Sequence, residues 1–367
     1  MASQIADRTM ENIEQIINFC NHITNNGYVQ GTPNWVQIKK SKFYFGGTAM
    51  GYFTGAPYKN IFDLAAEKAE AKSNTSELHI MAFGSMFEEL VKRVSEHDCG
   101  MKVYGENIYV IATELDSMKT SGLVAQPIAY SPDGIALIDT SVQGGPNVGI
   151  IPCLTEYKCP WSRDINGKVP LEYEAQQRMG MDVISRFAPV KLDLKWSLYL
   201  EAAFRTCRLD ELAFNPRYDP TFNVFKDKKP IPFTNTPVAI GIIGFVSQDP
   251  NFTLRGDFGK LSHDDLKNVI HSYAYNKIQP IYFDPVWKES SNYKITLKEQ
   301  LSTITASDKF VGFLPYKLFR RDYHWFERVE NFLDPYLPKM MDIAEIIQEV
   351  RAQPQESRLD ILNQLLR

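Results

Sequence analysis

Short apolar segments separated by Gly and Pro turns run through residues 101–157, and they constrain the fold more than any other part of the sequence. Their composition and spacing predict four strands, at 101–112, 123–129, 135–139 and 149–157. The later turns read Pro132-Asp133-Gly134 and Gly144-Gly145-Pro146-Asn147. Further strands are predicted downstream, at 195–204, 238–246 and 309–319. A meander-like central sheet is therefore expected.

Segments with the helical spacing of apolar residues precede and follow these strands. The predicted helices are 5–25, 60–72, 76–97, 171–186, 262–275 and a long stretch at 323–351. Ser262 is the expected N-cap of its helix, and Pro335 and Pro338 interrupt the last one. The expected fold class is mixed α/β (α+β), with a central mixed β-sheet flanked by helices.

Composition limits the classes of function. The chain has 367 residues, of which 44% are hydrophobic and 23% charged, and this excludes disorder over most of its length. The formal net charge of -4 excludes a strongly basic binder but allows a local basic groove. No HExxH or Walker A motif occurs, which argues against a zinc hydrolase and a P-loop ATPase.

Cysteine usage and the hydropathy pattern indicate the compartment. The five cysteines are scattered and include no CxxC pair, so neither a disulfide framework nor a cysteine-based metal site is expected. No apolar run reaches the length of a membrane span, and the first residues lack the pattern of a secretory signal. An intracellular protein without a membrane partner is therefore expected.

Two acids and a lysine give the sharpest chemical signal. Asp133 lies in the turn before one predicted strand, and Glu156 and Lys158 are two residues apart on the next, so their side chains share a face. If the two strands are neighbours, Asp133 and Glu156 converge, and their repulsion calls for a hard cation such as Mg²⁺ between them. A lysine beside a metal-activated water is a set of groups suited to phosphodiester hydrolysis. Taken separately, the turn and the strand acids are also compatible with an ordinary β-turn and a solvated face.

The motifs together resemble those of the PD-(D/E)XK nuclease superfamily and, within it, the lambda-exonuclease family of YqaJ-like viral recombinase nucleases. The resemblance covers roughly residues 35–205 well and 310–345 loosely. It is carried by Ser131-Pro132-Asp133-Gly134, Glu156-Tyr157-Lys158-Cys159-Pro160, a G-x-x-x-E helix (Gly84 to Glu88), a Y-x-A-Q helix (Tyr173 to Gln176), Phe45-Gly46-Gly47-Thr48-Ala49 and a closing strand-to-helix junction at 321–327.

This resemblance implies a restriction-endonuclease-like core and a set of catalytic residues. Asp133, Glu156 and the backbone carbonyl of Tyr157 would hold Mg²⁺, for which Mn²⁺ can substitute, and Glu88 would serve a second metal ion or a water. Lys158, assisted by Gln176, would position the attacking water.

The resemblance also implies a binding site for DNA and a terminal 5′-phosphate. Thr48 and Ser131 would supply its hydroxyl groups, and Arg163 would reach a DNA phosphate. Lys40 or Lys42 would replace the arginine that the family carries, giving a point charge in place of a bidentate fork.

The implied function is a Mg²⁺-dependent exonuclease that digests linear duplex DNA, 5′ to 3′, in recombination, replication or repair in a phage or a DNA virus. Its implied partners are duplex DNA ends, a single-strand annealing (recombination) protein and further copies of the chain. The compartment would be the cytoplasm of a bacterial host, or the cytoplasm or nucleus of an infected eukaryotic cell.

Two alternatives remain open. One is a structure-specific or single-strand endonuclease of the same superfamily, acting on DNA or RNA. The other, from a different class, is a non-catalytic DNA-binding scaffold on a nuclease fold. The expected organisation is an N-terminal helical segment (1–34), a nuclease core (35–210 with 306–345), an insertion or elaboration of that core (211–305) and a C-terminal helical tail (346–367).

Overall fold

The computed structural model describes residues 2–41, 45–71, 78–112, 128–161, 163–214 and 236–366. Within them, one nine-stranded sheet has the strand order β1-β4-β5-β6-β11-β7-β10, with β8 beside β11 and β9 beside β7. A second, two-stranded sheet pairs β2 with β3. The strands are β1 (Val103–Tyr104), β2 (Val110–Ile111), β3 (Ala129–Tyr130), β4 (Gly134–Asp139), β5 (Ile150–Lys158), β6 (Trp196–Thr206), β7 (Ala239–Ser247), β8 (Gly256–Asp257), β9 (Ile278–Ile281), β10 (Val286–Trp287) and β11 (Phe310–Glu327).

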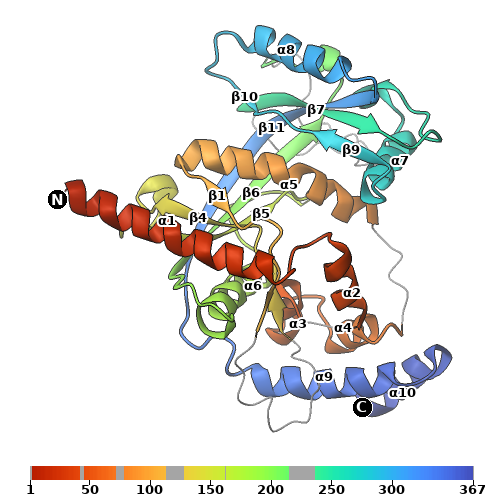
Figure 1. Ribbon diagram of the computed structural model, residues 1–367. Helices are drawn as coiled ribbons and strands as arrows, with labels where there is room; N and C mark the ends of the chain where they lie inside the picture. The colour runs from red at the N-terminus through yellow and green to blue at the C-terminus, as the bar shows by residue number, and fades with distance from the viewer. Residues whose placement is uncertain are drawn as a thin grey trace.

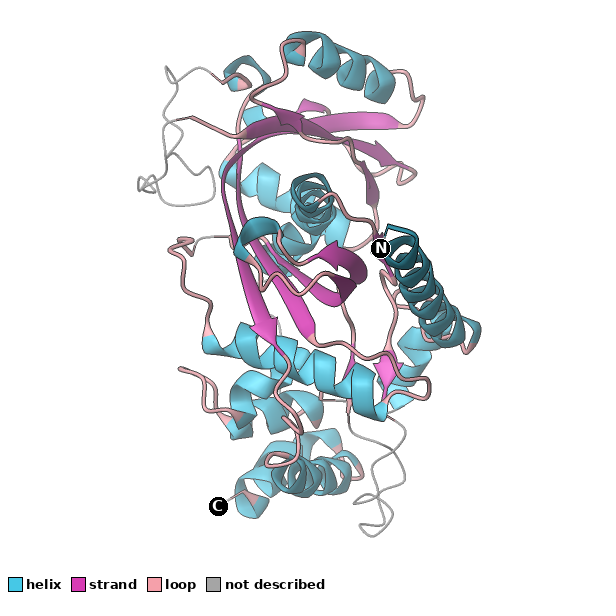
Figure 2. Cartoon of the chain, turned by 90° about the vertical axis from the view of Figure 1, so that its left-hand side faces the viewer, coloured by secondary structure: helices cyan, strands magenta, loops and turns pink. Residues whose placement is uncertain are grey.

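Helices lie against the sheet and below it (Figure 1). They are α1 (Ala2–Asn25), α2 (Pro33–Ser41), α3 (Met50–Phe53), α4 (Ile61–Lys68), α5 (Leu78–Cys99), α6 (Leu171–Asp182), α7 (His263–Ala274), α8 (Tyr293–Thr305), α9 (Leu337–Arg351) and α10 (Arg358–Leu365). Figure 2 shows the long strands curving around the central helices over much of the height of the molecule. The predicted fold class, a mixed sheet flanked by helices, is confirmed.

The centre of the sheet departs from a meander. β4 and β5 form an antiparallel pair, but β5 and β6 run parallel, and α6 lies between them in the sequence. Parallel neighbours need such a crossover, because a tight hairpin can join only antiparallel strands. The predicted meander is therefore wrong at this step, and the crossover brings α6 to the carboxyl end of β5.

The longest strand corrects a predicted helix. Residues 323–327 continue β11 and pair with 196–200 of β6, and the next helix, α9, begins only at Leu337. Tyr199 contacts the rings of both His324 and Phe326 across the strands. Such cross-strand aromatic contacts stabilise a sheet, and they outweigh the helical spacing that the sequence suggested here. Residues 321–327, the predicted strand-to-helix junction, thus form the last part of β11.

The predicted strand over 101–112 is divided between two sheets. β1 pairs with β4, whereas β2 pairs with β3. Gly105 and Asn107, between them, have φ angles of 68° and 61°, which interrupt an extended chain. The predicted strand over 123–129 lies mostly outside the described residues.

The chain between 236 and 305 adds strands to the same sheet. β7 pairs with β11 along its length, and β9 and β10 pair with β7. Buried residues of this part, including Phe245 and Ile270, belong to the same hydrophobic cluster as Phe87 and Leu90 of α5. The predicted domain boundaries stay a prediction, but this shared core places α7 and β9 next to α5 (Figure 1).

The two ends of the chain are helical, as predicted. α1 buries Ile16, Phe19 and Ile23 in a cluster that also contains Ile135 of β4 and Leu154 of β5. α9 and α10 contribute Ile347 and Leu362 to that cluster, and Arg351 forms an ion pair with Glu70 (3.1 Å). Among the described residues, no helix combines the length and apolarity that a bilayer span requires.

Candidate active site

The β4–β5 pair brings the predicted turn and strand together. Asp133 immediately precedes β4, and its Oδ2 accepts a hydrogen bond from the backbone N–H of Tyr157 on β5 (2.7 Å). Gly134 lies opposite Thr155, and a Cβ added there would lie 2.8 Å from Thr155 Oγ1 and collide with Val103. The glycine of the turn thus allows β1, β4 and β5 to approach at the point where Asp133 meets the strand.

Glu156 is fully buried beneath this turn. Its Oε2 accepts a hydrogen bond from the Tyr130 hydroxyl (3.0 Å), and its Oε1 accepts hydrogen bonds from Gln176 Nε2 and Lys158 Nζ. Burial, followed by the charge of Asp133, raises the pKa of Glu156 to about 7, although Lys158 and Tyr130 act in the opposite direction. The carboxylate is therefore held by three donors from β3, β5 and α6.

The ammonium group of Lys158 lies close to Glu156, the Tyr157 carbonyl and Asp133. Its Nζ contacts Glu156 Oε1, donates a hydrogen bond to the Tyr157 carbonyl (3.1 Å) and lies 3.7 Å from Asp133 Oδ2. Burial lowers the pKa of Lys158, but the carboxylates of Glu156, Asp133 and Glu88 outweigh it and raise the pKa well above its ordinary value. The ammonium group therefore lies among three oxygen atoms that the sequence assigned to a cation.

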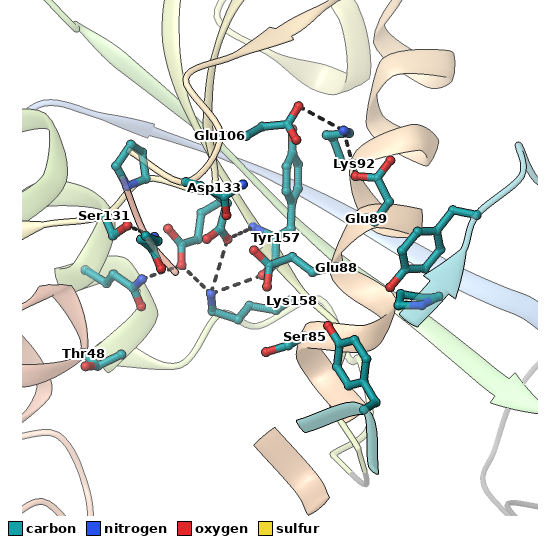
Figure 3. A pocket seen from close by; sticks show the side chains of 18 residues that line it. Thr48, Ser85, Glu88, Glu89, Lys92, Glu106, Ser131, Asp133, Tyr157 and Lys158 are labelled. Atoms are coloured by element: carbon teal, nitrogen blue, oxygen red, sulfur yellow. Dashed lines mark hydrogen bonds and ion pairs between the residues drawn. The ribbon is translucent and has the colours of Figure 1, made fainter. Parts of the chain in front are cut away.

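Glu88 approaches from α5, on the opposite side (Figure 3). Its carboxyl forms a hydrogen bond with Asp133, and burial, together with the charge of Asp133, raises the pKa of Glu88 to about 9. The neighbouring Glu89 points elsewhere, pairing with Lys92 (2.7 Å) and Arg93 (2.9 Å). Glu88, Asp133 and Glu156, called here the acidic cluster, thus converge from α5, the turn before β4, and β5.

A cleft of about 770 Å³ opens over this cluster (Figure 3). Its lining includes eight of the predicted site residues: Thr48, Glu88, Ser131, Asp133, Glu156, Tyr157, Lys158 and Gln176. Thr48 and Ser131 lie toward one end, and Glu89, Lys92 and Glu106 toward the other. A Cβ on Gly47 would lie 2.6 Å from Gln176 Cγ, so this glycine permits the close approach that brings Thr48 to the cleft.

The predicted phosphate-binding residues are placed differently from one another. Ser131 Oγ donates a hydrogen bond to the Ile108 carbonyl (2.8 Å) and accepts one from Gln30 Nε2. Arg163 does not line the cleft, and its guanidinium pairs with the buried Glu201. The side chain of Lys40 and all of Lys42 lie outside the described residues.

Several residues in or next to the cleft have no counterpart in the sequence prediction. Tyr130 is the buried partner of Glu156, and it directly precedes the Ser131 turn, which is its one local signal. Gln30 and Asn107 come from loops, and Tyr273 and Tyr282 from a part of the chain without a recognised motif. These residues are identified as part of the site only from their positions in the folded chain.

Comparison with known proteins finds distant relatives in African swine fever virus. A protein of the strain Badajoz 1971 Vero-adapted is 26% identical over 257 residues, covering 68% of this chain and 69% of that protein. Its counterpart in the Malawi Lil 20-1/1983 isolate is 27% identical over 258 residues, covering 67% and 70%. The names of these viral proteins state no activity, and no family model matches the chain.

Among solved structures, the alkaline exonuclease LHK-Exo from Laribacter hongkongensis is similar at 16% identity with a TM-score of 0.28, covering 44% of this chain and 69% of that one. Its complex with dAMP is similar over 43% of this chain with the same score. Likeness at this level assigns no activity, so function is argued below from the site residues.

Proposed function

We propose that this chain is a metal-dependent nuclease that hydrolyses the backbone of DNA from an end. The observation that carries the proposal is the position of Lys158 Nζ, in contact with Glu156 Oε1, 3.1 Å from the Tyr157 carbonyl oxygen and 3.7 Å from Asp133 Oδ2. A cation is thus already held by the three oxygen atoms that the motif resemblance assigns to a metal. The resemblance and the geometry support the same chemistry.

The donor set fits a hard divalent ion. Among the described residues, no three His, Cys, Asp or Glu side chains form a ready-made metal cluster, and the third oxygen at this corner is a backbone carbonyl. Asp133, Glu156 and the Tyr157 carbonyl offer the oxygen ligands that Mg²⁺ and Mn²⁺ prefer, with Glu88 next to them for a second ion or its water. Bound there, the metal would activate water and neutralise charge on the phosphate.

The surrounding side chains have distinct tasks in this proposal. Tyr130 and Gln176 hold Glu156 in place by donating to its two oxygens. Oε1 of Gln176 is buried without a donor among the described residues, and it can accept a hydrogen bond from the attacking water. Lys158 donates its protons toward that water and the phosphate oxygens. Water would attack phosphorus and lose a proton to the solvent, the P–O3′ bond would break, and the leaving 3′-oxygen would take up a proton. The product strand then keeps its 5′-phosphate.

The polarity of digestion rests on the other end of the cleft. Thr48 and Ser131 line it together, and their hydroxyls can donate to a terminal 5′-phosphate. Arg163 would join them only by leaving Glu201, and Lys40 or Lys42 would supply the positive charge. Digestion from the 5′ end, association of copies into a ring and a single-strand annealing partner are proposed on the sequence resemblance.

The decisive experiment uses linear duplex labelled at either the 5′ or the 3′ end, with covalently closed circles in parallel. Wild-type protein with Mg²⁺ should release the 5′ label first as a mononucleotide, and EDTA should stop the reaction. Asp133→Ala should be inactive, whereas Asp139→Ala, which changes an exposed acid at the far end of β4, should match wild type. Digestion of closed circles would favour the endonuclease alternative, and DNA binding without any cleavage would favour the scaffold.

A further inference from the structure

One wall of the cleft comes from α7 and β9. Tyr273 of α7, Pro280 of β9 and Tyr282 just after it line the same cleft as Glu88 and Lys158. These three residues, called here the tyrosine wall, are half-buried, so part of each ring faces the cleft. They lie outside every motif that carries the sequence resemblance.

Hydrogen bonds fix the tyrosine wall to α5. The Tyr282 hydroxyl donates to the backbone carbonyl of Met86 (2.7 Å), two residues before Glu88. The Tyr273 and Tyr282 hydroxyls share a further hydrogen bond, and the charge of Glu88 acts on both phenols. The rings are therefore held at a set position beside the acidic cluster, which favours recognition of a flat group.

The charges of the cleft leave little attraction for phosphate. Among the described residues, its lining contains five carboxylates, those of Glu88, Glu89, Glu106, Asp133 and Glu156, and two amines, those of Lys92 and Lys158. Both amines are already engaged by carboxylates, Lys92 at 2.7 Å from Glu89 and 2.9 Å from Glu106. A strand that enters this cleft must gain much of its affinity from uncharged contacts or from bound metal, because its phosphates compete with these carboxylates for the two amines.

We propose that Tyr273 and Tyr282 stack against an unpaired base of the DNA strand being cut, so that the end of a duplex must open before its strand enters the cleft. The inference rests on the proposed nuclease function and deepens it by naming the form of the substrate. Aromatic side chains bind the faces of all four bases, so this wall gives strand selection without sequence preference. The cleft volume, about 770 Å³, is that of a small-ligand pocket, which suits a few nucleotides.

The test is a double-mutant cycle between ring and base. A single-stranded DNA oligonucleotide with phosphorothioate linkages, which slow hydrolysis, carries an abasic nucleotide at each of its first four positions in turn. Its affinity is measured with Mg²⁺ by fluorescence anisotropy for wild type and Tyr273→Leu. On the intact strand Tyr273→Leu should raise Kd by about tenfold, the size of one stacking contact. At one abasic position the two losses should not add, because each removes the same contact.

Two controls separate stacking from structure. Tyr273→Phe keeps the ring and loses the hydroxyl, so it should bind like wild type. Tyr275→Leu changes a tyrosine near the end of the same helix that is 65% exposed and does not line the cleft, and it should also bind like wild type. If Tyr273→Leu lowers the melting temperature below the assay range, Tyr273→Met replaces it.

The inference is overturned if the ring and base effects add at all four positions, or if Tyr275→Leu weakens binding as much as Tyr273→Leu. Failure of the proposed function would look different. Unmodified DNA would then survive wild-type protein with Mg²⁺, while the binding cycle would still report whether ring and base meet.

Discussion

The cleft holds two lysines, each between two carboxylates, and the two sites differ in what surrounds the lysine. In the acidic cluster Lys158 contacts Glu156, whose side chain is 1% exposed, with Asp133 and a backbone carbonyl nearby. Toward one end of the cleft, Lys92 pairs with Glu89 and with Glu106, whose side chain is 40% exposed. The same charges thus form a three-oxygen cation site on a buried acid in one place and a partly exposed ion-pair network in the other. Burial of the acid, more than the pairing itself, separates a candidate reactive centre from a surface network.

The largest expected difference between the two lysines is in stability without metal. Lys158→Met leaves the buried Glu156 without its cation and should lower the free energy of unfolding by about 3 kcal/mol at pH 8. Lys92→Met breaks a partly exposed pair and should change it by less than about 1 kcal/mol. Urea unfolding in EDTA measures both.

The pH dependence of that difference has a definite sign. The pKa of Glu156 is raised to about 7 in the folded protein, so its carboxyl becomes neutral as the pH falls through that value. A neutral carboxyl needs no counter-ion, and the loss caused by Lys158→Met should therefore shrink toward pH 5. Equal losses of unfolding free energy for Lys158→Met and Lys92→Met at pH 8 would contradict the contrast between the two lysine sites.

The second-largest expected difference between the two lysines is in the turnover number, kcat. Lys158→Ala removes a donor from the reacting phosphate and should lower kcat by about 10²–10³-fold. Lys92 lines the same cleft but lies away from the acidic cluster, so Lys92→Ala should keep kcat near the wild-type value. Initial rates on linear duplex with saturating Mg²⁺ provide the measurement, and comparable losses for both variants would show that the cleft needs positive charge in general.

The stabilisation of the fold by metal should depend on the acids around Lys158 and not on those around Lys92. With Mg²⁺ at a hundred times its Kd, wild type should gain about 2.7 kcal/mol of stability, since a ligand that binds only the folded state stabilises it by mass action. Asp133→Asn, which weakens one oxygen ligand, should lose most of this gain, whereas Glu106→Gln at the other end should keep it. Thermal melting with and without Mg²⁺ measures this gain. An equal gain for both variants would show that Mg²⁺ stabilises the protein without binding at Asp133.

The contrast also explains what the sequence could predict. Asp133, Glu156 and Lys158 are brought together by a two-residue step on one strand and by the register of adjacent strands, and both follow from local pattern. The strand character of 323–327 depends on pairing with β6, more than a hundred residues earlier, and a local spacing rule missed it. Tyr282 contacts Met86, which lies 196 residues earlier in the sequence, so no local motif could predict the tyrosine wall. Arg163 was assigned by motif, but the buried Glu201 on a later strand now holds it.

The smallest expected effect concerns Ser131, which lies between the acidic cluster and the end of the cleft that holds Thr48. Its hydroxyl already donates to the Ile108 carbonyl, so a 5′-phosphate competes with an existing hydrogen bond (2.8 Å) and gains little beyond it. Ser131→Ala should therefore raise KM for 5′-phosphorylated ends by only about threefold, below the usual value of a hydrogen bond to a charged group, and leave kcat unchanged. KM for 5′-hydroxyl ends should not move, because those ends lack the phosphate. A matching rise on both kinds of end would assign Ser131 to the loop that positions Asp133 and remove it from the phosphate site.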